Sequence, residues 1–241
     1  MHIGAHLNAL GILAGALFGL TARRPLSGRT QERFKVALGA FTVAFGLRLV
    51  AENLHGNFPA AARQLGLAML GVLAGCWLGK ILRLQKISNR VGHHAAGLLA
   101  AAQKNPPGKT ADGLLATTIL FCAAPLGMLG TVADGLSGDF SLLLLKGVMD
   151  GLAMASFVKM FRWPVALAAF PVLFFLSGLT LGVRFGLLPW LAAHHLAAPV
   201  NLAAGLIACA VAVVIFEIRR VELNGYLPGL AVAPLLAWLW P

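Results

Sequence analysis

Two ionisable residues lie one helical turn apart inside an apolar segment of the chain. Lys146 and Asp150 are separated by four positions, in a segment that extends from Phe140 to Met160. Residues at this spacing share one face of a helix. Asp150 lies about ten residues, or about 15 Å, into the segment, near the middle of a bilayer. An ammonium and a carboxylate at that depth can form a structural clamp, or can exchange their pairing for a bound ion or charged solute.

A predicted helix break precedes this pair. Pro125, Gly127 and Gly130 interrupt an apolar run, and Asp134 follows them. Proline removes a helical hydrogen bond and clashes with the preceding turn, so we expect a kink or break near Pro125. A broken backbone at membrane depth survives only where protein or a wet cavity shelters it. Asp134 is interpreted either as part of a site at this break or as a helix cap.

Asn8 lies in the first apolar segment, where its amide can hydrogen-bond across helices. Asn201 begins a later apolar segment, and a cap and a ligand role are both compatible with that position. The candidate substrate- or ion-binding site comprises Asn8, Pro125, Gly127, Gly130, Asp134, Lys146 and Asp150.

The sequence carries none of the motifs that identify catalytic sites. A serine–histidine pairing in context, a phosphate-binding loop and a two-histidine zinc helix are all missing from it. Asp134 and Asp150 could together transfer a proton, which leaves acid–base chemistry as an alternative. The three cysteines lie inside apolar runs and their spacing fits no metal site. We therefore expect a protein that is not an enzyme, with no catalytic residue, no cofactor and no metal.

The composition predicts the kind of element that positions these residues. Of the 241 residues, 59% are hydrophobic and 11% are charged, whereas soluble domains have about 25% charged residues. Apolar runs recur along the whole chain, which indicates an all-α, polytopic transmembrane helix bundle in a single integral membrane domain, 1–241. The net charge of +11 would suit nucleic acid, but the basic residues cluster in alternate loops, as the positive-inside rule requires. We expect membrane lipid as a partner and no nucleic acid.

Hydropathy predicts about eight spans. Their approximate ranges are 2–21, 34–50, 65–82, 114–132, 140–160, 164–183, 200–218 and 226–240. Basic residues follow the first, third, fifth and seventh of these spans, so both termini are predicted outside the cytoplasm, in a bacterial inner membrane. The polar stretch after the third span is predicted to include an interfacial amphipathic helix over 81–102.

Two segments resemble each other weakly. One reads Leu13-Ala-Gly-x-x-x-Gly19 and the other Leu176-Ser-Gly-x-x-x-Gly182. Loop charges place these segments in opposite directions, which suggests an inverted repeat of 1–83 and 163–241 around central spans within 114–160. Chance similarity is the alternative, because small residues at this spacing are common in membrane helices.

Glycines at four-residue spacing form a stripe on the first span, at Gly11, Gly15 and Gly19. Such a stripe lets another helix approach closely. Because two-fold pairing is the commonest assembly, we expect a second copy of the chain to cover this stripe in a homodimer.

The middle block resembles a known family. Phe121-Cys-x-x-Pro-x-x-x-x-Gly-x-x-x-Asp-Gly135, followed by Lys146-x-x-x-Asp-Gly151, is similar to the signature of bacterial membrane proteins classed as domain of unknown function 554. Asn8 and the segment Leu223-Asn-Gly-Tyr-Leu-Pro228 also match in kind, whereas Ala123-Ala124 replaces the glycine that the family more often has before the proline. The resemblance covers nearly the whole chain. It implies a polytopic fold with a polar core and carries no established activity.

These observations favour a transporter or channel for a small solute or ion, with its site near the midplane at the broken helix. The alternative is a non-transporting membrane scaffold, assembly partner or sensor. In a transporter the polar groups should converge on one solvent-reachable cavity, whereas in a scaffold they should be paired and dry.

Overall fold

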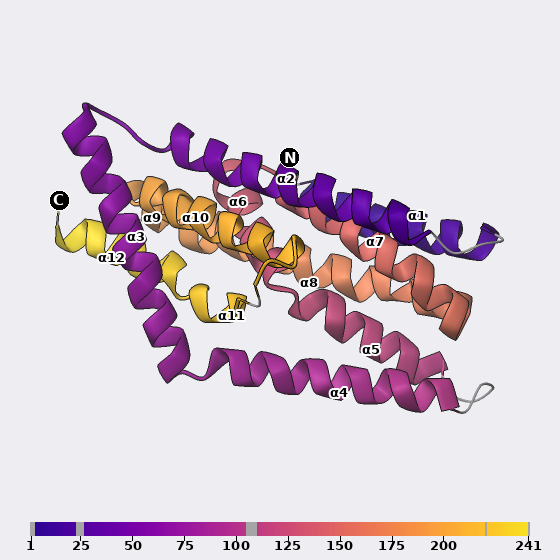
Figure 1. The fold of residues 1–241 in the computed structure, drawn as a ribbon. Coiled ribbons are helices and arrows are strands. Elements are labelled where there is room, and N and C mark those ends of the chain that lie inside the picture. The colour runs from indigo at the N-terminus through magenta and orange to yellow at the C-terminus, as the bar shows by residue number, and fades with distance from the viewer. Residues whose placement is uncertain (1–2, 23–26, 105–109, 220, 241) are drawn as a thin grey trace. The chain divides into compact units, whose positions relative to one another are not determined.

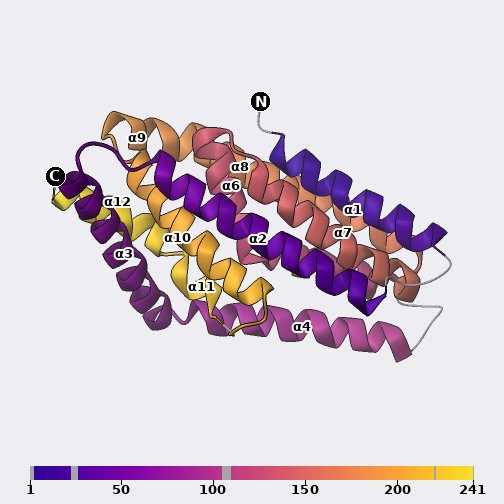
Figure 2. The ribbon, with the colours of Figure 1, turned by 45° about the horizontal axis from the view of Figure 1, so that its top comes forward.

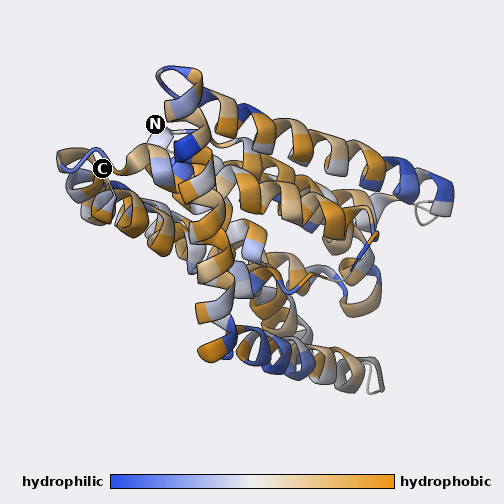
Figure 3. Cartoon of the chain, turned by 60° about the vertical axis from the view of Figure 1, so that its left-hand side comes forward, coloured by the Kyte–Doolittle hydropathy of each residue, from blue (hydrophilic) through white to orange (hydrophobic). Residues whose placement is uncertain are grey.

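A computed structural model describes residues 3–22, 27–104, 110–219 and 221–240. These residues form helices joined by turns and short loops, and they contain no strand (Figures 1 and 2). Helices satisfy their own backbone hydrogen bonds, which is the condition for crossing a bilayer. The predicted all-α class is confirmed. Figure 3 shows apolar residues over most of the helices and polar residues concentrated toward helix ends.

The chain divides into two compact units, each assembled from two separate stretches. Unit 1 comprises Met1–Ser27 and Ile87–Leu181, and unit 2 comprises Gly28–Lys86 and Gly182–Pro241. The predicted repeats, 1–83 and 163–241, therefore each draw residues from both units. The inverted repeat remains a prediction.

In unit 1, α1 (Gly4–Thr21) packs in parallel along α7 (Ser141–Phe161). Gly11 lies against the backbone of Gly147, Gly15 against Gly151 and Gly19 against Ala155. The absence of a side chain at these positions allows the two backbones to meet. The glycine stripe that we expected a second copy to cover is therefore covered by α7 of the same chain. The homodimer stays a prediction, without the stripe as its support.

A break divides the fourth predicted span. The first part, α5 (Thr110–Ala123), ends before Ala124, whose backbone is extended with φ −65° and ψ 124°. The second part, α6 (Pro125–Ser137), begins with Pro125, and the two helices are bent by 54°. Proline disfavours a helical conformation in the residue before it and is well suited to the first position of a new helix. The predicted break at Pro125 is confirmed.

Further helices complete unit 1. After α7 the chain forms a 3₁₀ segment, η1 (Trp163–Ala168), and then α8 (Ala169–Leu181). The buried core draws on α1, α5, α7, η1 and α8, with Ile12, Phe121, Leu143, Met154 and Leu176 among its residues. Most of the segment predicted to be amphipathic, 81–102, lies in α4 (Leu84–Lys104), which is indeed amphipathic.

Unit 2 contains two antiparallel helix pairs. In the first, α2 (Gly28–Glu52) packs on α10 (Ala197–Ile215), and in the second, α3 (Phe58–Ile81) packs on α12 (Gly229–Leu239). Gly46 meets Gly205 in the first pair, and Gly75 meets Gly229 in the second. The shorter elements of this unit are the π segment η2 (Gly182–Leu187), α9 (Leu188–Ala193) and α11 (Leu223–Tyr226).

The expectation of about eight spans is wrong. Within the described residues, six helices are long and apolar enough to cross a membrane, or seven if the bent pair counts as one span. The eighth predicted span falls in Leu223–Leu239, which is shorter than the about 20 residues of a usual span and is divided by a turn at Pro228. The sixth is longer than predicted, because helix continues from Trp163 to Ala193 through the region expected to be a loop.

Candidate functional site

The close approach of α1 and α7 in unit 1 brings Asn8 to Asp150. A Cβ atom on Gly147 would lie 2.9 Å from the Cα atom of Asn8, so only glycine fits at that crossing. One turn further along α7, the Asp150 carboxylate reaches the Asn8 side chain, and Asn8 Nδ2 donates a hydrogen bond to Asp150 Oδ2 at 3.0 Å. The glycine crossing therefore positions two predicted site residues that are 142 positions apart in sequence.

Lys146 and Asp150 form an ion pair in the interior of unit 1. The Lys146 ammonium donates to Asp150 Oδ2, the same oxygen that accepts from Asn8. The Lys146 side chain is 1% exposed and the Asp150 side chain 10% exposed. A charge this deeply buried is costly unless it is paired, so each of these two groups requires the other as its partner. The two residues share a helix face, as their spacing predicted.

The Lys146 side chain lies against the helix break. Its Nζ atom is 5.7 Å from the centroid of the Phe121 ring, which belongs to the last turn of α5. A Cβ atom on Gly127, in the first turn of α6, would lie 2.9 Å from Lys146 Cε. The aromatic ring offers a cation–π contact and the glycine leaves room for the lysine stem. The structure thus brings Gly127, two residues after Pro125, together with Lys146, Asp150 and Asn8.

Asp134 contacts the start of α1, and Gly130 packs against α7. Asp134 is fully buried in α6, and its Oδ2 atom accepts a hydrogen bond from the backbone N–H of Gly4 at 3.2 Å. Gly4 is the first residue of α1, so Asp134 satisfies an N–H group at the start of a helix other than its own. A Cβ atom on Gly130 would lie 2.8 Å from Leu143 Cδ2, which makes Gly130 a point of close packing on α7.

One hydrogen-bond acceptor beside the ion pair has no partner. Asn8 is fully buried and its Oδ1 atom has no hydrogen-bond partner. A buried acceptor without a donor costs about 1–3 kcal/mol, so a site of this kind favours a donor or a cation beside it. At the break, the end of α5 presents carbonyl groups and the start of α6 presents N–H groups, and these carry opposite partial charges. The break therefore places helix-end partial charges beside the buried ion pair.

Two contacts are not predicted from the sequence. Phe121 appears there only within the family motif, although an aromatic residue one turn before a proline break is a signal for such a contact. In unit 2, Asn201 lies inside α10 and is not its cap, and its Nδ2 atom donates to Asn53 Oδ1 at 3.1 Å. Nothing in the sequence joins these two asparagines, which are 148 positions apart.

The part of the chain that the structure describes contains no candidate metal site. No group of three or more His, Cys, Asp or Glu residues lies close enough together there to hold a metal ion.

Comparison with known proteins places these features in a family. The family model described as "Protein of unknown function (DUF554)" matches residues 3–238. The chain is 28% identical over 245 residues to "Uncharacterized protein YqgA" of Escherichia coli (strain K12), covering 100% of this chain and 98% of that protein. It is 26% identical over 167 residues to "Uncharacterized membrane protein YdfK" of Bacillus subtilis (strain 168), covering 69% of this chain and 66% of that protein. No solved structure matches the chain.

Proposed function

The chain belongs to the DUF554 family, and from this premise we propose that it moves a small solute or ion across a bacterial inner membrane, as a transporter or channel and not as an enzyme. The proposed site is formed by Lys146, Asp150 and Asn8 at the break before Pro125. Discontinuous helices around buried charges are the usual setting of binding sites in membrane transporters.

One observation carries the proposal. A buried ion pair contacts both halves of a broken helix, through Phe121 on α5 and Gly127 on α6. A protein that needed only a stable bundle would gain as much from apolar residues in that place, since buried ion pairs seldom stabilise more than a well-packed apolar core. The cost of keeping the pair is therefore best explained by an exchange of its partners during transport.

A second candidate function rests on the same pair. Lys146 is 1% exposed and its ammonium is already neutralised by Asp150, which is the paired and dry state expected of a scaffold, assembly partner or sensor. In that case Lys146 and Asp150 form a clamp between the turns of α7, and Asn8 extends the clamp to α1.

The test is flux through purified protein in proteoliposomes. Concentration jumps of NaCl and KCl would be applied to the wild type, to Asp150→Asn, to the double variant Lys146→Gln/Asp150→Asn, and to Asp139→Asn. Asp139 is the matched control, because its carboxylate accepts a hydrogen bond from the Ser141 N–H at the start of α7, and the side-chain oxygen of asparagine can accept the same bond. Flux is normalised to the amount of folded protein inserted.

Transport at this site predicts that Asp150→Asn inserts but loses flux, that the double variant does not recover it, and that Asp139→Asn retains it. A clamp predicts that the single variant mainly loses stability and that the double variant restores both stability and activity, because the single change leaves a buried ammonium unpaired. Wild-type liposomes that pass neither salt faster than empty ones would contradict transport of these ions.

A further inference from the structure

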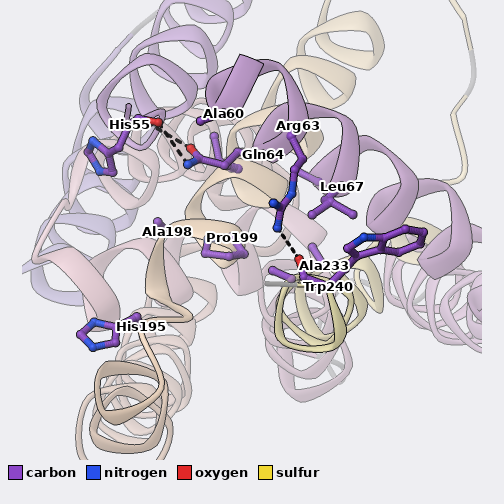
Figure 4. A pocket seen from close by; sticks show the side chains of 13 residues that line it. His55, Ala60, Arg63, Gln64, Leu67, His195, Ala198, Pro199, Ala233 and Trp240 are labelled. Atoms are coloured by element: carbon purple, nitrogen blue, oxygen red, sulfur yellow. Dashed lines mark hydrogen bonds between the residues drawn. The ribbon is translucent and has the colours of Figure 1, made fainter. Parts of the chain in front are cut away.

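A cavity of about 350 Å³ lies in unit 2, apart from the residues of the proposed site (Figure 4). It is bounded by the start of α3, the start of α10 and the last residues of α12. Leu67, Leu202, Ala233 and Trp240 contribute apolar walls. Its volume is at the small end of the roughly 300–1,000 Å³ that ligand-binding pockets occupy, and a largely apolar wall with few polar groups is typical of them.

The polar lining of this cavity is basic. Arg63, His55 and His195 all line it, together with the amide of Gln64, and no carboxylate of a described residue does. A guanidinium is permanently charged and its donors are arranged to bind two oxygens of a carboxylate at once. The cavity therefore has the polarity of an anion site.

Hydrogen bonds hold this basic lining in place. The Gln64 side chain accepts from the His55 backbone N–H and donates to the His55 carbonyl, each at 3.1 Å, which ties the loop before α3 to that helix. Arg63 Nη2 donates to the carbonyl oxygen of Trp240 at 2.6 Å, as Figure 4 shows. This bond uses one donor of the guanidinium and aims the group across the cavity, while the guanidinium has further N–H groups.

The start of α10 adds positive potential. Ala198 and Pro199 line the cavity and belong to the first turn of this 19-residue helix. The residue before the helix, Leu196, provides no side-chain cap for its N–H groups. His195 precedes it in a left-handed conformation, φ 56°, which a non-glycine residue seldom adopts. Uncapped N–H groups at a helix start favour a negative charge, and here they supplement Arg63.

We propose that this cavity binds a small organic anion, a carboxylate carried on an apolar body. The carboxylate lies at Arg63 and the start of α10, and the apolar body lies against Leu67 and Leu202. This site and its ligand stand independently of the proposed transport function, because none of its residues belongs to the site in unit 1.

The test uses benzoate as the probe and benzylammonium, which has the same ring with the opposite charge, as the control ligand. Binding is measured by equilibrium dialysis to the protein in phosphatidylcholine nanodiscs, whose lipid carries no net charge. Four variants are compared with the wild type: Arg63→Gln, Arg63→Lys, Ala198→Phe and Arg48→Gln. Arg48 is the matched control, since it is an exposed arginine of the same unit, is 3.9 Å from Glu52, and does not line the cavity.

Benzoate is expected to bind the wild type and Arg48→Gln equally. Arg63→Gln should weaken binding by at least about tenfold, because a charge-assisted hydrogen bond is lost, and Arg63→Lys should weaken it less. Ala198→Phe should abolish it by filling the cavity while Arg63 remains. Thermal unfolding verifies that each variant is folded. Equal binding of benzylammonium, undiminished benzoate binding by Arg63→Gln and Ala198→Phe, or no benzoate binding by the wild type at millimolar concentration would overturn the proposal.

Discussion

The residue that joins the site to the rest of unit 1 is Asn8. It is the contact from α1 to the carboxylate on α7, through a hydrogen bond of 3.0 Å from Nδ2 to Asp150 Oδ2. Its other side-chain atom, Oδ1, is buried without a partner. Asn8 thus donates to the Asp150 carboxylate and keeps an acceptor beside it, as the proposed site would require.

A double-mutant cycle between Asn8→Ala and Asp150→Asn should show coupling. Because the two side chains touch, we expect an interaction energy of about 0.5–2 kcal/mol in the free energy of unfolding, which is the range that hydrogen bonds contribute inside membranes. The measurement is reversible unfolding in mixed detergent. The same cycle between Asn8→Ala and Asp139→Asn is the control and should show additivity. Additivity in both cycles would mean that the negative charge of Asp150 does not strengthen its contact with Asn8.

At the scale of elements, the α1–α7 contact decides the geometry of the site. The two helices meet backbone to backbone, so the distance between them is set by the absence of side chains at Gly11, Gly15, Gly147 and Gly151. Such contacts replace the hydrophobic effect, which cannot drive association between helices in lipid. Any added atom at the crossing separates α1 from α7 and carries Asn8 away from Asp150.

Gly15→Ala should destabilise the protein by about 1–3 kcal/mol, the usual cost of overpacking. The new Cβ atom would lie 2.5 Å from the Cα atom of Gly151, and a backbone cannot turn aside as a side chain can. Gly178→Ala is the matched control: Gly178 lies on α8 of the same unit with nothing within 4 Å of an added Cβ atom, so this change should be neutral or stabilising by up to about 1 kcal/mol. Thermal unfolding in detergent compares the two, and equal melting temperatures would contradict the tight crossing.

At the scale of the whole molecule, the helix directions within each unit agree with the predicted topology. In unit 1, α1 and α7 run parallel, and in unit 2, α2 and α10 run antiparallel. The loop charges require these same relations. They also require that the bent pair α5/α6 crosses the membrane, because a re-entrant pair would move Lys159 and Arg162 to the outside.

Cysteine labelling tests this topology. In a chain whose natural cysteines are replaced by alanine, Ser137→Cys should react with a membrane-impermeant maleimide added outside intact cells, since it follows the crossing of α5 and α6. Arg29→Cys, in the basic segment after the first span, should react only after the membrane is opened. Protection of the cysteine at position 137 would show that the bent pair returns to the cytoplasmic side, and would contradict the predicted orientation of α7.

Local features of the site were predictable from the sequence. The proline at position 125 excludes a helical N–H and restricts Ala124, so the break must occur there in any fold. The four-residue spacing of Lys146 and Asp150 makes them neighbours in any helix. The apolar composition requires helices in a membrane, because only helices and closed barrels satisfy the backbone there. Each of these conclusions depends on residues within a few positions of one another.

The tertiary structure alone decided which helix covers which. A stripe such as Gly11, Gly15 and Gly19 indicates that something approaches closely, but it is equally compatible with a second copy and with α7, and only the fold selects α7. The predicted sixth span is too short, and the predicted eighth span is too long to match its helix. Hydropathy alone does not show that a helix continues past polar or glycine residues, or that a turn divides an apolar run. The contact of Asn8 with Asp150 and the placing of Phe121 over Lys146 join distant segments, and such pairings depend on shape complementarity between helices that no local pattern contains.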